Sequence, residues 1–232
     1  MLSDFQNKQI EVIDAIEQNI KNNHLTSSTI IPVKDFDNDS RICLTSVHFP
    51  HETLIAQIQK ELIDPLREIE PDFYYYPEDS LHLTIKNVRV IADPPNFSDK
   101  EIENVKSLFS LIIPKHTKFN VYFYRLLLFP NNLAVIGTTD PELDEIILDL
   151  DRKLTSAGIP DDKVYVNRNY FFSNMTLARF ADHPSKKFKQ KVQELSAALT
   201  LKPYTVDSVT LLSANAVMKK RNVIETWKLS NE

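Results

Sequence analysis

Residues 80–88, SLHLTIKNV, carry the pattern that most constrains the fold. Aliphatic residues alternate there with the polar residues His82, Thr84 and Lys86. Because successive side chains of a β-strand point to opposite faces, this pattern predicts a strand with one face in the core and one polar face. An imidazole exchanges protons near neutral pH, a hydroxyl donates to phosphoryl oxygens, and an ammonium adds positive charge. The polar face therefore suits a phosphate group.

A second segment, FFSNMTLAR at 171–179, repeats the arrangement. Asn174 and Thr176 alternate with Met175 and Leu177, but asparagine stands where the first segment has histidine. A single His-x-Thr occurs by chance in many half-buried strands, whereas two such copies in matching surroundings are more specific. We therefore expect two strands that face one cleft and bracket a phosphate.

Composition limits the kind of protein this can be. The chain has 232 residues, of which 42% are apolar, and this suits one large or two small domains. The net charge is −5, so any contact with nucleic acid has to be local. Only 2 glycines occur, and no Gly-rich phosphate loop is present. Side chains must therefore hold any phosphate.

The sequence also predicts the compartment. The single cysteine, Cys43, lies in an apolar run and reads as a core residue; it excludes an intrachain disulfide and fits a reducing compartment. No apolar run reaches the roughly 20 residues that span a bilayer, and the amphipathic, acidic N-terminus is unlike a signal peptide. We expect a soluble cytoplasmic monomer without membrane contact.

Periodicity divides the chain into helices and strands. Helices are expected at 3–22, 51–69 with a kink at Pro65, 98–113, 141–157 and 185–199. Strands are expected at 41–49, 80–88, 118–129, 133–138, 171–179, 205–213 and 222–229. Residues 23–40 are polar and turn-rich, which predicts an N-terminal helix and linker at 1–40 and a folded domain at 41–232. Each half of the chain holds one polar-x-Thr strand flanked by helices, as an internal duplication would.

The segments LHLTI (81–85) and FSNMTLAR (172–179) resemble the two motifs of the 2H phosphoesterase superfamily, which includes LigT-like 2′-5′ RNA ligases and cyclic phosphodiesterases. The resemblance covers roughly residues 41 to 230. It implies an α+β, bilobal, pseudo-twofold fold, in which two antiparallel-rich sheets line a central cleft and helices lie outside. It also implies action on 2′,3′-cyclic phosphodiesters of nucleotides or RNA ends, without cofactor or metal. The partner would be a nucleotide or RNA end with a cyclic or terminal phosphate.

The resemblance assigns roles to individual residues. His82 becomes a proton-transferring histidine, and Thr84 and Thr176 become phosphate-binding hydroxyls. Arg179 matches the arginine that follows the second motif in many members. The second histidine is missing, because Asn174 occupies its place.

Two further residues are candidates for substrate binding because of the chemistry of their side chains, and neither is part of the family motifs. Lys86 shares the predicted strand face with the first motif and lines either the cleft or the sheet edge. Tyr76, the last of three consecutive tyrosines, could offer a stacking surface for a base, or could simply belong to a tyrosine-rich strand. No cluster of residues has metal-ligand spacing, which predicts metal independence.

Asn174 leaves several functions open. Asparagine cannot exchange a proton at physiological pH, and each general acid or base contributes about 10²- to 10⁴-fold in rate. The substitution can mark a decayed enzyme that still binds ligand, an active subgroup with another proton donor such as His48 or His51, or an introduced inactivating change. The protein is therefore a weakened cyclic phosphodiesterase, or an inactive nucleotide- or RNA-end-binding protein, or a structural or partner-binding domain.

Overall fold

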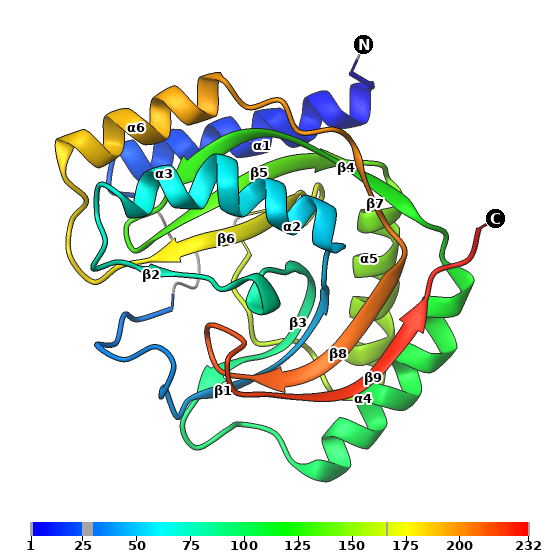
Figure 1. Ribbon diagram of the computed structural model, residues 1–232. Coiled ribbons are helices and arrows are strands. Elements are labelled where there is room, and N and C mark those ends of the chain that lie inside the picture. Colours follow the sequence, from blue (N-terminus) through cyan, green and yellow to red (C-terminus); the bar gives the residue numbers. More distant parts are fainter. Residues whose placement is uncertain (1, 25–29, 166, 232) are drawn as a thin grey trace.

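The computed structural model describes residues 2–24, 30–165 and 167–231, and it contains two antiparallel sheets with helices on the outside (Figure 1). Sheet A has the order β3 (Leu83–Ala92), β1 (Ile42–His48), β8 (Ser208–Ala214), β9 (Arg221–Lys228). Sheet B has the order β2 (Tyr74–Tyr75), β6 (Ser173–Arg179), β5 (Asn132–Thr139), β4 (Phe119–Leu128), β7 (Tyr204–Val206). The α-helices are α1 (Asp4–Lys21), α2 (Glu52–Ile58), α3 (Asp64–Arg67), α4 (Asp99–Ile112), α5 (Glu142–Ser156) and α6 (Lys186–Ala197). None of the helices in the described ranges is long and apolar enough to cross a membrane.

The predicted bilobal α+β fold is confirmed. Each sheet contains one polar-x-Thr strand, since β3 lies at the edge of sheet A and β6 lies within sheet B. These two strands contact each other across the boundary between the sheets. The two motifs, about ninety residues apart in the sequence, are therefore neighbours in space.

The sheets do not correspond to consecutive halves of the chain. The strand expected at 205–213 divides at Asp207, so that β7 joins sheet B and β8 joins sheet A. Asp207 stabilises this crossing, because its carbonyl accepts a hydrogen bond from the Leu229 backbone and its carboxylate accepts one from Ser208. Strands from both ends of the chain therefore build sheet A. The two polar-x-Thr strands therefore do not belong to two consecutive, separately folded halves of the chain.

The helix predicted at 51–69 is present with an irregular centre. A π-helical turn, η1 (Gln59–Ile63), separates α2 from α3 and lies directly before Pro65. Proline lacks an amide hydrogen and crowds the carbonyl four residues earlier, so a widened turn at this point relieves the clash. The other short helices are the 3₁₀ turns η2 (Glu78–Ser80) and η3 (Ile113–Lys115).

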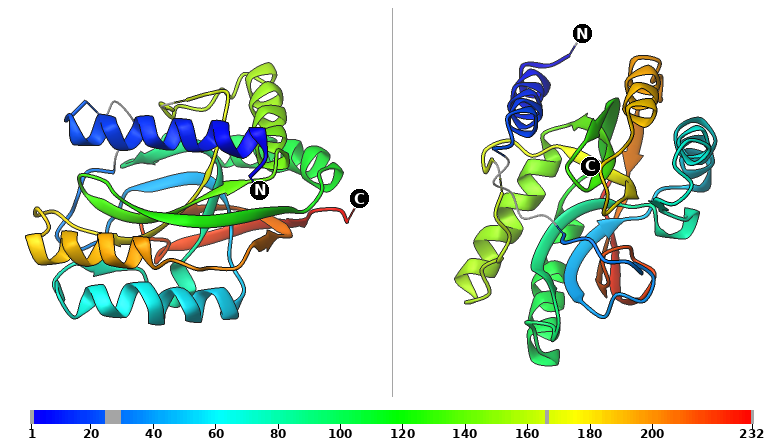
Figure 2. Two further views of the ribbon diagram at one scale, coloured as in Figure 1. Left: turned by 90° about the horizontal axis from the view of Figure 1, so that it is seen from above. Right: turned by 90° about the vertical axis from the view of Figure 1, so that its left-hand side faces the viewer.

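Helix α1 covers one face of sheet B. Its N-terminus has a capping box formed by Ser3 and Gln6, and its apolar residues Ile13 and Ile16 are buried against β4 and β5. The partners of this small core are Leu127, Ala134 and Ile136. Figure 2 shows α1 and α6 on opposite sides of the sheet.

The register identifies which face α1 covers. Ala134 pairs with Thr176 and Ile136 pairs with Asn174, and paired residues of an antiparallel sheet point to the same side. The helix that precedes the predicted domain therefore lies on the same face as the second motif.

A buried glutamine fastens α1 to this face. The Gln9 side chain is fully buried; its amide donates to the Thr139 hydroxyl at 2.8 Å and to the Phe171 carbonyl, and its oxygen accepts from the Thr139 backbone at 2.8 Å. A buried polar group left without its partner costs about 1–3 kcal/mol. We expect Gln9→Ala to lower the free energy of unfolding by about 2–4 kcal/mol in a urea titration.

The control is Gln18→Ala on the exposed side of the same helix, which should change stability by less than about 0.5 kcal/mol. Equal effects of the two substitutions would contradict the anchoring role of Gln9.

Candidate functional site

A cavity of about 400 Å³ lies where the two sheets meet, and both motifs line it. His82, directly before β3, and Thr84, near the start of β3, border it from one side, and Asn174 and Thr176 border it from β6. The four residues that the sequence placed in the two motifs therefore share one site. The two strands bracket this cavity as the repeated spacing predicts.

His82 is held in one orientation and one tautomer. Its Nδ1 lies 2.7 Å from the Ser80 carbonyl, and because a carbonyl only accepts, Nδ1 carries the hydrogen. The lone pair is then on Nε2, which has no hydrogen-bond partner among the described residues. Burial, helped by the positive charge of Arg179, lowers the pKa of His82 to about 4, although the bond to the Ser80 carbonyl opposes the shift. His82 is therefore a neutral imidazole that can accept a proton.

The three other motif side chains are free to contact a ligand. Thr84, Asn174 and Thr176 are half-buried, and their polar atoms make no hydrogen bond within the described part of the chain. Two hydroxyls and one amide thus offer donors to the cavity. This is the pattern expected for groups that bind the oxygens of a phosphate.

Arg179 lines the same cavity and is positioned by Tyr76. The guanidinium Nε donates to the Tyr76 hydroxyl at 2.8 Å, and that hydroxyl donates to the Ala216 carbonyl at 2.8 Å. Tyr76 is fully buried and does not border the cavity. Tyr76 therefore orients Arg179 and does not offer a stacking surface to the cavity, which is one of the two alternatives that the sequence leaves open.

Of the two positions that the sequence leaves open for Lys86, the cleft and the sheet edge, the structure excludes the cleft. Ser46 pairs with Lys86 and Val47 pairs with Thr84, so Ile85 has no partner on β1 and forms a β-bulge. The extra residue shifts the alternation by one position, and Asn87, not Lys86, lines the cavity. A bulge of this kind depends on the partner strand and leaves no mark on the alternating pattern.

The Lys86 ammonium is buried in an ion cluster instead. It pairs with Asp151 at 3.0 Å and with the buried carboxylate of Asp161, and its Nζ lies 5.2 Å from the centre of the Tyr165 ring. With two carboxylates as partners, this ammonium is already neutralised. It fastens the loop after α5 to β3 and is not available to a substrate.

Sequence reasoning missed several residues of the cavity wall. The loop between α5 and β6 contributes Lys163 and Tyr165, and α1 contributes Ile16. Aromatic residues also border the cavity, namely Phe129, Tyr170, Phe171 and Phe172. No periodic pattern marks these loop residues, because their position depends on contacts between distant parts of the chain.

The cavity wall has a distinctive charge. It contains the cationic residues Arg179 and Lys163 together with His82, but none of the described residues that line it is an aspartate or glutamate. The whole chain carries a net charge of −5. The charge of the described cavity wall is thus opposite to that of the whole protein. A positively charged wall favours an anionic ligand.

The two histidines considered as substitutes for the missing one lie elsewhere. His48 is buried, with Nδ1 3.0 Å from the Ser208 carbonyl and Nε2 accepting from the Tyr204 hydroxyl at 2.8 Å. The His51 backbone donates to that same hydroxyl at 3.1 Å. Neither histidine lines the cavity. Neither therefore replaces the proton donor that Asn174 lacks.

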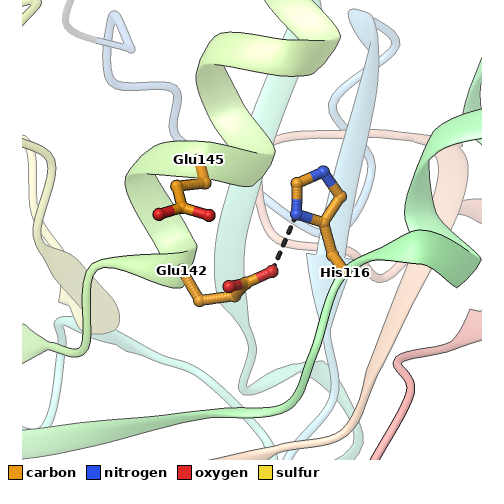
Figure 3. Close-up of side chains that lie close together, drawn as sticks. All are labelled: His116, Glu142 and Glu145. Atoms are coloured by element: carbon orange, nitrogen blue, oxygen red, sulfur yellow. Dashed lines mark hydrogen bonds and ion pairs between the residues drawn. The ribbon is translucent and has the colours of Figure 1, made fainter. Parts of the chain in front are cut away.

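One cluster has donor atoms close enough for a metal ion. His116, Glu142 and Glu145 offer ligand atoms within 4.8 Å of one another (Figure 3). Glu142 already accepts from His116 Nδ1 at 2.7 Å and from the Thr117 backbone at 2.9 Å, and His116 Nε2 lies 3.3 Å from Asp149. These bonds tie His116, which directly follows η3, to α5, and none of the three residues borders the cavity.

Comparison with known proteins identifies the fold. No protein-family model matches the sequence, and no curated protein matches it. Among solved structures, Escherichia coli LigT complexed with phosphate superposes with a TM-score of 0.52 at 15% identity, covering 83% of this chain and 99% of LigT. The fold is that of LigT. E. coli LigT complexed with 3′-AMP gives a TM-score of 0.51 at 15% identity with the same coverage, and a conserved Agrobacterium tumefaciens protein of unknown function, ATU0111, gives 0.53 at 12%, covering 90% of this chain and 97% of that one.

Protonation of the buried histidines should weaken the fold in acid. Burial lowers the pKa of His48 and of His82 to about 4 in the folded protein, against about 6.5 when unfolded. The unfolded chain then binds more protons, so the free energy of unfolding falls as the pH drops from about 6.5 to about 4, by about 3 kcal/mol for each histidine. We expect His82→Asn to reduce this loss, measured by urea unfolding at pH 7 and pH 4.5.

Asparagine keeps a donor for the Ser80 carbonyl but does not titrate. The control is exposed His183→Asn, which should leave the acid dependence as in the wild type. An unchanged acid dependence in His82→Asn would show that this imidazole is not buried and neutral.

Lys86→Met separates a structural role from a ligand-binding role. Removing the ammonium leaves the carboxylate of Asp161, only 5% exposed, without its partner. We expect the free energy of unfolding to fall by about 3–5 kcal/mol, with little change in phosphate affinity. Lys106→Met, which breaks the exposed ion pair with Glu225, should cost less than about 1 kcal/mol. If Lys86→Met instead kept the stability of the wild type and lost affinity for phosphate, Lys86 would be a substrate-binding residue.

Proposed function

We propose that this protein belongs to the 2H phosphoesterase superfamily and binds the phosphate of a nucleotide or RNA end between its two motifs. The observation that carries the proposal is the cavity wall. Imidazole, hydroxyl, amide and guanidinium groups converge there with no carboxylate among the described lining residues. Such a set satisfies the oxygens of a phosphate and repels no part of its charge.

The comparisons support this ligand class. Solved structures of LigT with the same fold are complexed with phosphate and with 3′-AMP. Aromatic side chains of this chain border the cavity beside the polar groups, including Phe171 and Tyr170. Such rings can stack on a base while the motif residues hold the phosphate.

The arrangement fits the opening of a 2′,3′-cyclic phosphate with one proton-transfer group missing. The Nε2 of His82 would accept a proton from water as the water oxygen attacks phosphorus, while Thr84 and Thr176 bind the phosphoryl oxygens. The bond from phosphorus to one ribose oxygen then breaks, and that oxygen needs a proton that Asn174 cannot supply. We infer that binding is retained and that turnover is weakened by about 10²- to 10⁴-fold.

A catalytically inactive binding protein is the second candidate. It is favoured by the same observation, since Asn174 keeps a hydrogen-bond donor in the cavity but removes a titrating group. We place either form in the cytoplasm, because the free cysteine, Cys43, is buried and unpaired and so fits a reducing compartment.

Binding and turnover can be measured separately. We expect 3′-AMP to bind the wild type in calorimetry. Thr84→Val and Thr176→Val should each raise the Kd by about 5- to 50-fold, because each removes one hydrogen bond to a charged group. Asn174→His should raise the rate of opening of 2′,3′-cyclic AMP by at least about 10²-fold, since it restores the second proton-transfer group.

The control is Thr226→Val on β9, whose hydroxyl bonds Thr210 and lies outside the cavity. Wild-type turnover abolished in a His82 variant would favour an enzyme, and binding without turnover would favour the binding protein. Absence of both binding and turnover, in the wild type and in Asn174→His alike, would overturn the phosphate assignment.

A further inference from the structure

Lys163 is the cation in the cavity that no motif contains. It lies on the loop between α5 and β6, is half-buried, and lines the cavity together with both motifs. Its ammonium lies over the Tyr165 ring, 5.3 Å from the ring centre. A cation over an aromatic face is attracted to it, which holds the lysine in place but does not neutralise its charge.

Lys163 differs from Lys86 in having no ion-pair partner in the described part of the chain. Both ammonium groups lie within 5.3 Å of the Tyr165 ring centre, but Lys86 pairs with Asp151 and Asp161. Lys163 forms no ion pair and no hydrogen bond with any described residue. Asp161 attracts it, and the Lys86 charge repels it.

Burial of this unpaired cation has an energetic cost. It lowers the pKa of Lys163 to about 8, with the Asp161 carboxylate opposing the shift. The group is therefore still mainly protonated at neutral pH. A partly buried charge without an ion-pair partner among the described residues is unfavourable, and a bound anion would relieve this.

We propose that the Lys163 ammonium binds the phosphoryl group that Thr84 and Thr176 hold, and so restores from a loop the positive charge that Asn174 does not provide. This inference rests on the proposed function and names the side chain that contributes most to the affinity for the phosphate group. A charged donor in a partly dry cavity contributes more than a neutral hydroxyl. The ligand must then carry its negative charge at the point where the loop, β3 and β6 meet.

The test compares four proteins in calorimetric titrations at pH 7. The variants are Lys163→Met, Lys163→Arg and the control Lys202→Met, an exposed lysine outside the cavity. The probes are inorganic phosphate and 3′-AMP, with adenosine as the ligand that lacks a phosphate. We expect Lys163→Met to weaken Kd for both phosphate ligands by about 10- to 100-fold and to leave adenosine binding unchanged. Lys163→Arg should stay within about fivefold of the wild type.

The outcomes separate this inference from the proposed function. Suppose that Lys163→Met binds phosphate as the wild type does, while Thr84→Val and Thr176→Val bind it more weakly. The role of Lys163 is then overturned, and the phosphate site between the two motifs is retained. If the wild type binds neither phosphate ligand, both proposals fail. Should Lys163→Met not fold by circular dichroism, Lys163→Gln replaces it, with the same expected loss.

Discussion

The contact between β3 and β6 is the constraint on which the rest of the structure depends. It joins the edge of one sheet to the interior of the other, and it turns two separate polar strand faces into the walls of one cavity. Each motif alone would be a half-exposed strand with a few polar side chains. Joined, they place an imidazole, an amide and two hydroxyls around a space large enough for a phosphate and part of a nucleotide.

Charge is distributed so that this cavity stays free of carboxylates. Lys86 forms ion pairs with the nearby side chains of Asp151 and Asp161, and the bulge at Ile85 turns Lys86 away from the cavity. Lys163 and Arg179 keep their charge without a carboxylate partner in the described part of the chain. The same ion cluster therefore stabilises the loop after α5 and leaves the cavity cationic.

Helix α1 links the region before the predicted domain to the site. It lies on the motif-bearing face of sheet B, Gln9 fastens it there, and Ile16 reaches the cavity wall. The domain boundary predicted at residue 40 reflects the polar composition of residues 23–40. It does not separate α1 from the candidate site. The apolar wall that the helix helps to form would face the non-phosphate part of a ligand.

The sequence by itself determined the elements and the two motifs. Alternation with period two marks both motif strands, because this signal acts between residues close in the chain. Only the tertiary structure decided that Lys86 leaves the cavity, that Lys163 enters it, and that the chain changes sheets at Asp207. Bulges, loop positions and ion pairs depend on contacts between distant residues, and no local pattern encodes them.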